Sequence, residues 1–238
     1  MAAVAQAPAP QEAPRAGRGR RPMTHRERDR LRLEISRAAV RLFREHGIVA
    51  TSGERIAAEV GLSGRTLWRY FRTKESCVEP VLVRGLDGLV QTLRAWPVDR
   101  SLDEHLLEVP RVADPEADAD GEAALAVIGM SRTDPALRAV WLVVHERAEA
   151  TLAGLVAERA GRPPDDLTVR VRAAALAGAL RITSEDLAVA FLDGDTPVDP
   201  AGRLTEAVRA ANQGVDRGVD DARTHPSSPA RTYPAGEQ

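Results

Sequence analysis

Residues 51–74 read TSGERIAAEVGLSGRTLWRYFRTK, a stretch with the spacing of a helix-turn-helix. The first of its two short helices has one apolar face, made by Ile56, Ala57 and Val60. Thr51 with Glu54 three positions later fits a capping box, which would start this helix at Thr51. Gly61 follows the last apolar turn, where a left-handed backbone ends a helix at little steric cost. The pattern therefore predicts a helix, a tight turn and a second helix.

The second helix is expected to have a buried side and a basic side. Ser63 is a good N-cap, because its hydroxyl can accept a hydrogen bond from a backbone N–H two or three residues on. Leu67 and Phe71, four positions apart, should point at the core. Arg65 and Arg69 then lie on the opposite face. Guanidinium groups suit contacts with DNA, because they grip phosphate, or O6 and N7 of guanine, with two parallel hydrogen bonds.

The distribution of charge supports this interpretation. Residues 15–74 hold 15 Arg and one Lys against six Asp or Glu, a formal net charge of +10. The whole chain carries −2, so the remainder is acidic. A basic N-terminal block joined to an acidic remainder is typical of a nucleic-acid-binding segment on a domain that does not bind DNA. Solvated arginines on an ordinary helical bundle are the alternative explanation.

The run from Arg41 to Glu75 resembles the N-terminal signature of the TetR family of bacterial transcriptional regulators. The matching positions are Leu42-Phe43, Gly47, Ala50-Thr51, Ile56-Ala57, Val60-Gly61-Leu62-Ser63, Thr66-Leu67-Trp68-Arg69-Tyr70-Phe71 and Lys74-Glu75. Lys74 is also the only lysine of the chain.

This resemblance assigns roles to individual residues. It implies phosphate contacts from Thr66, Tyr70 and Lys74. It implies reading of base edges by Gly64 and Arg65. The residues that we predict to contact DNA are Thr51, Ser63, Gly64, Arg65, Thr66, Trp68, Arg69, Tyr70 and Lys74.

Two residues depart from the family pattern. Trp68 stands where Tyr is usual, and its indole N–H can donate a hydrogen bond but the ring cannot accept one. Gly53 stands where an apolar residue is usual, which should loosen the packing of the second helix of the domain. Both departures put individual contacts in question and leave the DNA-binding interpretation in place.

Residues 1–23 are rich in Ala, Pro, Arg and Gly, and we expect a disordered basic arm. The segment Gly17–Pro22 resembles the core of an AT-hook. Its arginines, Arg18, Arg20 and Arg21, suit a narrow A·T minor groove, where the negative potential is enhanced. A solvated low-complexity tail is the alternative.

Helices are expected throughout the chain, since Ala, Leu, Arg, Glu and Val dominate and no alternating β-branched run occurs. We expect an all-α fold of about nine helices, with those outside the helix-turn-helix over 26–46, 74–96, 101–109, 121–131, 134–159 and 165–192 and after Pro200. Gly47 should end the first of them, and the Asp114-Pro115 segment should be a loop. The expected divisions are the arm (1–23), a helix-turn-helix DNA-binding domain (24–73), a helical effector-binding and dimerisation domain (74–213) and a disordered tail (214–238).

The last two helices resemble the dimerisation pair of the family, which forms a four-helix bundle with the same pair of a second copy. Covering the core of a single subunit is the alternative. A homodimer suits a palindromic operator, whose half-sites lie about one helical turn apart. In the family the C-terminal helices also enclose a small-molecule effector. The residues that we expect to line such a pocket are Met130, Trp141, His145, Leu176 and Leu180.

Several other classes of protein fit the sequence poorly. A single cysteine, Cys77, excludes an intrachain disulfide, fits a reducing cytoplasm and is expected to be filler on a helix face. No apolar run reaches the ~18 residues of a membrane span, and the N-terminus lacks the apolar segment of a signal peptide. His145-Glu146 has no second His four positions on, and no Gly-rich phosphate loop follows a strand. We therefore expect no enzyme activity, no cofactor and no metal site.

Together these features predict a cytoplasmic, homodimeric, sequence-specific DNA-binding transcriptional regulator. We favour a repressor that a small-molecule effector releases, because repression requires only that a promoter be blocked. An activator or dual regulator of the same fold is one alternative. A nonspecific DNA-binding architectural module is the alternative from another class.

Overall fold

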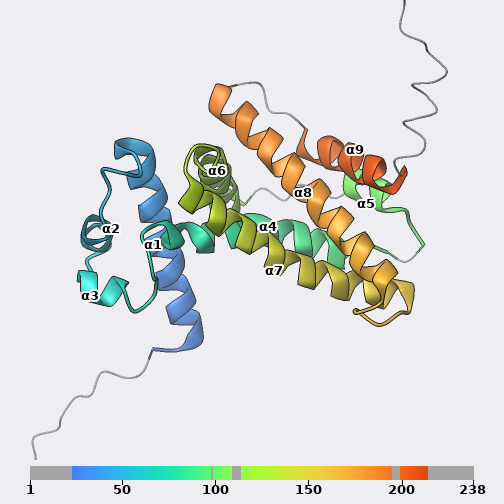
Figure 1. Cartoon of the computed structure of the whole chain (residues 1–238), viewed down its shortest axis with the longest axis horizontal. Helices are drawn as coiled ribbons and strands as arrows, with labels where there is room; N and C mark the ends of the chain where they lie inside the picture. Colours follow the sequence, from blue (N-terminus) through green and yellow to red (C-terminus); the bar gives the residue numbers. More distant parts are fainter. Residues whose placement is uncertain (1–22, 98, 109–113, 195–198, 214–238) are drawn as a thin grey trace, which may run out of the picture.

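The computed structural model of the chain describes residues 23–97, 99–108, 114–194 and 199–213. Within these ranges it contains nine α-helices and one 3-10 helix, and no strand (Figure 1). The elements are α1 (His25–His46), α2 (Gly53–Glu59), α3 (Gly64–Leu67), η1 (Glu75–Val78), α4 (Glu79–Arg94), α5 (Leu102–Glu108), α6 (Pro115–Met130), α7 (Pro135–Ala160), α8 (Leu167–Asp193) and α9 (Pro200–Gln213). The predicted all-α fold is confirmed.

Helices α1, α2 and α3 lie together at one end of the molecule (Figure 1). Helix α1 begins with a capping box, in which the side chains of Thr24 and Glu27 each accept a hydrogen bond from the other residue's backbone N–H. It ends at Gly47, as predicted, where φ is 81°. Helix α1 packs against α2, η1, α4 and α6, so it supports the other N-terminal elements from one side.

The helix expected over residues 74–96 is divided in two. Its first turn is the 3-10 helix η1, and the α-helix begins only at Glu79, with Pro80 in its first turn. Proline lacks a backbone N–H and disfavours helical geometry at the preceding residue, so it suits a helix start and not a helix interior. The predicted start at Lys74 is therefore wrong by about one turn.

Helix α6 begins six residues earlier than the predicted residue 121. Asp114 is its N-cap, and the carboxylate accepts hydrogen bonds from the backbone N–H of Glu116 at 3.1 Å and Ala117 at 3.3 Å. Pro115 occupies the first helical position. The Asp114-Pro115 segment, expected as a loop, is thus a helix start of the same kind as Asp134-Pro135 at α7.

One continuous core joins the N-terminal helices to α4, α6 and α7. Full burial of each large apolar side chain contributes about 1.5–3 kcal/mol. Among the largest buried side chains of this core are Phe43, Ile56, Leu67, Leu82, Leu137 and Trp141. This core includes residues on both sides of the predicted domain boundary between residues 73 and 74. Packing therefore does not mark the two parts as separate, and the boundary stays a prediction.

A second buried cluster holds the far end of the molecule together. It lies where α8 meets α7 and α9 and where α5 covers α9. Three alanines of α8, Ala173, Ala177 and Ala179, are buried in or beside it, and their small side chains let neighbouring helices approach closely.

Two sequence-based predictions lie outside the described residues. They are the arm arginines Arg18, Arg20 and Arg21, and the tail at 214–238. Of the helices that are described, none combines the length and the apolarity needed to cross a membrane. Cys77 is fully buried, and burial raises the pKa of its thiol to about 12, so it is packing filler and not a reactive thiolate.

Candidate nucleic-acid interface and ligand cavity

The helix-turn-helix begins one residue later than the sequence suggested. Ser52 is the N-cap of α2, and its hydroxyl accepts a hydrogen bond from the backbone N–H of Arg55 at 3.2 Å. Thr51 is fully buried, and its hydroxyl donates to the carbonyls of Gly47 at 2.8 Å and Leu42 at 3.2 Å. Both the capping box at Thr51 and its predicted DNA contact are therefore wrong, because this side chain closes the turn after α1.

The turn and the start of α3 agree with the prediction. Gly61 has φ of 68°, and the backbone N–H of Leu62 donates to the carbonyl of Ala57 at 2.8 Å. Ser63 is the N-cap, accepting from the backbone N–H of Thr66 at 3.2 Å. The corner between the two helices is thus fixed by backbone and cap together.

Helix α3 is shorter than expected. It is a single turn, Gly64–Leu67, after which the chain continues through tighter bonds from Arg69 N–H to the Thr66 carbonyl and from Tyr70 N–H to the Leu67 carbonyl. Leu67 and Phe71 are nevertheless both buried, as predicted. The predicted outer residues therefore lie on a turn of helix plus a helical extension.

Arg65 and Arg69 are exposed, and neither guanidinium pairs with a described residue. The hydroxyls of Ser63 and Thr66 lie beside them, 2.9 Å apart. A Cβ added at Gly64 would meet Glu54 at 3.6 Å and Nε1 of Trp68 at 3.9 Å, both ordinary contact distances, so packing within the chain does not require glycine there. This face of α3 offers unpaired cations, hydroxyl donors and close access to the backbone.

The two departures from the family pattern compensate each other. A Cβ added at Gly53 would lie 2.1 Å from Cζ2 and 2.3 Å from Cη2 of the Trp68 ring. The indole therefore occupies the space that a side chain at position 53 would take, and Gly53 is buried beneath it. The expectation that Gly53 loosens the packing of this helix is wrong, because the larger ring of Trp68 fills the gap.

Lys74 has a partner within the chain. Its ammonium donates to the carbonyls of Ile48 at 2.5 Å and Thr51 at 2.9 Å, and it lies 4.0 Å from the carboxylate of Glu75. It thus ties the start of η1 to the turn between α1 and α2. A contact of Lys74 with phosphate stays a prediction. It would use the N–H of the ammonium group that does not donate to these two carbonyls.

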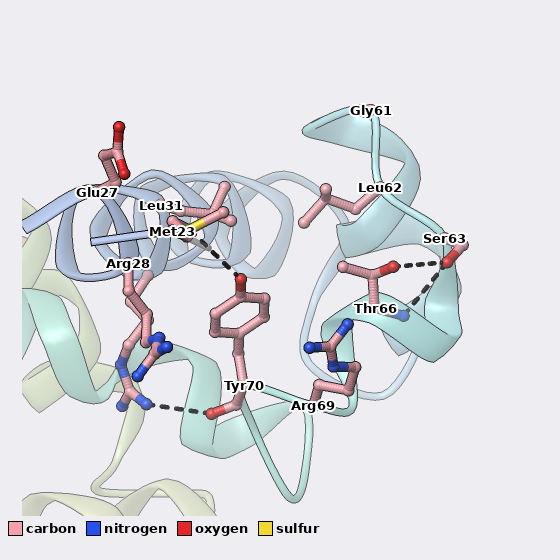
Figure 2. A pocket seen from close by; sticks show the side chains of 11 residues that line it. Met23, Glu27, Arg28, Leu31, Gly61, Leu62, Ser63, Thr66, Arg69 and Tyr70 are labelled. Carbon is pink, nitrogen blue, oxygen red and sulfur yellow. Dashed lines mark hydrogen bonds between the residues drawn. The ribbon is translucent and has the colours of Figure 1, made fainter. Parts of the chain in front are cut away.

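A groove of about 1080 Å³ separates the start of α1 from α3 and the residues that follow it (Figure 2). Ser63, Thr66, Arg69 and Tyr70 of the predicted set line it, so the structure brings these four together. The sequence analysis missed the opposite wall, which carries Met23, Glu27, Arg28, Leu31 and Arg32 of α1 and its approach. Arginines are so frequent over residues 15–74 that nothing in the sequence singles out these two.

A second cavity, of about 410 Å³, lies among α4, α5, α6, α7, α8 and α9. Most of its described lining is aliphatic, and the polar side chains in that lining are the indole of Trp141 and the hydroxyls of Thr92, Thr183 and Ser184. Of the five residues predicted to line an effector pocket, Trp141 and Leu180 do so. The remaining three, Met130, His145 and Leu176, lie outside this lining, and an effector contact from them stays a prediction.

A charged network lies behind Trp141. Oε1 of Glu185 accepts hydrogen bonds from Arg138 at 2.6 Å, Arg181 at 3.1 Å and the indole N–H of Trp141 at 3.2 Å. Burial alone would raise the pKa of the Glu185 carboxyl, but these hydrogen bonds outweigh it and lower the pKa. Glu185 therefore stays ionised and fixes the orientation of the indole that forms part of the cavity wall.

His145 packs edge-on against Trp141, with ring centroids 4.0 Å apart. Only 6% of the residue is exposed, and neither ring nitrogen has a partner among the described residues. Burial, and secondarily the charge of Arg181, lowers the pKa of His145 to about 4. Its ring is neutral at pH 7.

An ion pair that the sequence did not predict joins the DNA-binding end to the cavity. Asp120 of α6 is 2% exposed, and its two carboxylate oxygens accept from Nε and Nη2 of Arg37 in α1 at 2.7 and 2.8 Å. Arg84 of α4 lies 3.6 Å from the same carboxylate. The next residue, Gly121, lines the cavity. One turn of α6 therefore contacts both helix α1, through Asp120, and the cavity, through Gly121.

Comparison with known proteins gives the family. Residues 35–81 match the model for bacterial regulatory proteins of the tetR family, and residues 114–214 match the MftR C-terminal domain. The HTH-type transcriptional regulator TcmR of Streptomyces glaucescens is 28% identical over 152 residues, which cover 60% of this chain and 66% of TcmR. The chain thus spans just under two thirds of the length of that relative.

A solved structure shares the fold. Thermus thermophilus FadR, a TetR-family transcriptional repressor in complex with lauroyl-CoA, is 20% identical to this chain with a TM-score of 0.51. The likeness covers 87% of this chain and 100% of FadR. At this level of identity the comparison bears on the arrangement of the helices alone.

A helix-turn-helix whose outward arginines pair with no described residue is thus carried on an all-α body, and the N-terminal and C-terminal parts of the chain each match a family model. The chain belongs to the TetR family of bacterial regulatory proteins.

Proposed function

We propose that this regulator is a repressor, which binds a palindromic operator as a homodimer in the cytoplasm and leaves it when a small molecule enters the cavity. The observation that carries the DNA-binding part is the exposed α3 face, where Arg65 and Arg69 lack partners within the described chain and lie beside two hydroxyl groups. Unpaired guanidinium groups on a turn of helix suit base edges and phosphates of a duplex. We assign no catalytic role to any residue.

Selection of duplexes from a random pool tests this part. We expect the chain to enrich one palindromic sequence and to bind it at least ~10³-fold more tightly than unrelated duplexes at physiological salt. Arg65→Ala should weaken binding to the selected duplex by about 1–3 kcal/mol and relax the preference at one base position. Equal binding to all duplexes would instead favour the nonspecific architectural module.

The exposed apolar face of α8 supports the homodimer. Large apolar side chains stay exposed at Leu167, Val171 and Ile182, and the small Ala174 and Gly178 complete the same stripe at helical spacing. The sequence analysis predicted that α8 pairs with α9 in the dimer. Helix α9, however, packs onto α5 and α8 of its own chain. Helix α7 has large apolar side chains exposed, at Leu142 and Val143. We therefore propose that α7 and α8 form the four-helix bundle with a second copy. A monomer at micromolar concentration in sedimentation equilibrium, with no pairing on operator DNA, would contradict this.

The lining of the cavity indicates the class of effector. Among the described residues it contains no charged side chain, and its few hydroxyls can each make a hydrogen bond with a neutral polar group. Burying an unpaired ionised group there would be strongly unfavourable. We therefore propose an uncharged, largely apolar effector.

The route from the cavity to DNA is the shared turn of α6. Gly121 lines the cavity, and Asp120 beside it holds Arg37 of α1. An effector that displaces this turn changes how α1 is held, and it can shift the equilibrium only if it prefers one of the two arrangements.

A cavity-filling variant tests the effector proposal with a matched control. A Cβ at either Gly121 or Gly154 meets open space, but only Gly121 lines the cavity. Lauryl alcohol is a suitable uncharged probe, since FadR carries a lauroyl group. We expect the alcohol to raise the melting temperature of the wild type and of Gly154→Leu but not of Gly121→Leu. Equal shifts in all three proteins would show that the probe binds elsewhere.

Transcript levels after gene deletion separate repressor from activator.

A further inference from the structure

The groove between α1 and the end of the helix-turn-helix is cationic on both walls. Arg28 and Arg32 of α1 line one side of it, and Arg69 lines the other. Arg28 and Arg69 lie on opposite sides of the Tyr70 ring (Figure 2). Among the described lining residues one is acidic, Glu27. Its carboxylate accepts from the backbone N–H and the hydroxyl of Thr24 at 2.7 and 2.9 Å, so it is committed to capping α1.

The three arginines differ in what already holds them. Arg32 is fixed, because its Nη1 donates to the carbonyl of Tyr70 at 3.2 Å and its guanidinium lies 4.8 Å from the ring centroid of Phe71. Arg28 and Arg69 are exposed and pair with no described residue. The groove therefore has one positive charge set in its wall and two free guanidinium groups at its opening.

Hydroxyl groups complete the donor set. The Tyr70 hydroxyl points across the groove to Sδ of Met23, at 3.7 Å (Figure 2). A thioether is a weak acceptor, so this bond is easily exchanged for one to an anionic oxygen. The hydroxyls of Ser63 and Thr66 line the same groove. Guanidinium and hydroxyl donors spaced along an open channel suit a chain of phosphodiesters.

We propose that the sugar-phosphate backbone of the operator lies in this groove, with Arg28 of α1 contacting a phosphate opposite Tyr70 and Arg69. This inference rests on the DNA-binding function proposed above. It adds a residue of α1 to the interface and makes α1 a direct DNA contact besides a support for the other helices. The contact carries no sequence information, since every nucleotide has the same phosphate.

The test compares Arg28→Gln with Arg30→Gln in the full chain. Arg30 lies on the same helix, is exposed and does not line the groove, so it controls for loss of one positive charge. Loss of one phosphate contact flattens the plot of log affinity against log salt by ~0.9, which is roughly fivefold in affinity at 0.15 M salt. We expect this change for Arg28→Gln, alike on the selected operator and on an unrelated duplex, and no change of slope for Arg30→Gln. Equal slopes for the two variants would overturn the proposal.

A second measurement locates the contact on the DNA. Operators that carry a single uncharged methylphosphonate are scanned position by position with wild type and Arg28→Gln. We expect one phosphate per half-site whose neutralisation weakens the wild type and leaves Arg28→Gln unaffected. If every position weakens both proteins equally, Arg28 touches no phosphate and the proposal is wrong.

Two further arms separate the groove from the general function. If the wild type enriches no duplex at all, the DNA-binding function fails and the groove proposal falls with it. If it enriches an operator while the two Gln variants behave alike, only the groove proposal fails.

Replacing chloride by inorganic phosphate at constant ionic strength should weaken operator binding only slightly, and strong competition would instead indicate a site for free phosphate.

Discussion

Replacing Asp120 with Asn removes the charge that joins α1 to α6 while keeping the size of the side chain. In the wild type both carboxylate oxygens accept hydrogen bonds from Arg37, at 2.7 and 2.8 Å, and Asp120 itself is 2% exposed. Asn retains one acceptor and turns an N–H₂ group toward a guanidinium that can only donate. The variant therefore leaves Arg37 with one of its two hydrogen bonds to residue 120 and without the opposite charge there.

The cost depends on how far each partner is buried. Removing one member of a fully buried ion pair costs about 3–5 kcal/mol. Arg37 keeps 35% of its side-chain surface exposed, so water compensates part of the loss. We expect a loss of about 2–3 kcal/mol in the free energy of unfolding, in line with hydrogen bonds to a charged group. For a chain of this size that lowers the melting temperature by about 4–12 °C.

Urea unfolding at pH 7 measures this loss, with Glu116→Gln as the control. Glu116 lies 3.5 Å from the same Arg37 but is 81% exposed, so its loss should cost under about 1 kcal/mol. The ratio of operator affinities without and with effector should also approach one in Asp120→Asn. A variant that unfolds at the wild-type urea concentration and keeps the wild-type ratio would refute both the ion-pair energetics and the route through α6.

Three further predictions concern other parts of the chain. Gly53→Ala places a methyl group where the Trp68 ring lies, so overpacking should lower the free energy of unfolding by about 1–3 kcal/mol and operator affinity should fall. Gly64→Ala is the control, because a methyl group has room there and the stability measured in urea should stay unchanged. The lowered pKa of His145 means that its neutral form contributes stability above pH 6.5, and about 3 kcal/mol is lost as pH falls from 6.5 to about 4. Urea midpoints of wild type and His145→Leu should therefore diverge over that window, and parallel curves would contradict the assignment. Deleting residues 1–22, which join the chain at the groove residue Met23, should flatten the salt dependence of operator binding, and an unchanged slope would leave the arm as a solvated tail.

Local signals in the sequence predicted the helices well where the pattern was strong. Asp134-Pro135 followed by a long apolar stripe identified the start of α7. The same pair of residue types at Asp114-Pro115 was missed, because the residues after it are acidic and small and show no apolar period. The choice between Thr51 and Ser52 as N-cap depended on which hydroxyl faces the helix, and two adjacent hydroxyl residues leave that undecided.

Contacts between distant residues were beyond the sequence. The burial of Asp120 depends on Arg37, 83 positions earlier, and an Asp in an acidic segment otherwise predicts a solvated face. Gly53 and Trp68 each looked like a defect when considered alone, and only their contact shows that they compensate. Two of the five predicted effector residues, Trp141 and Leu180, line the cavity and three do not, since apolar character along a helix does not say which side chains face a cavity.

The continuous core that runs from α2 and α3 into α6 and α7 has a practical consequence for engineering. A chimera that exchanged only the first 73 residues between two regulators would create a seam through tightly packed side chains such as Phe71 and Val78. Altering the operator preference of this protein is therefore better done by changing surface residues of α3 than by exchanging the whole N-terminal segment.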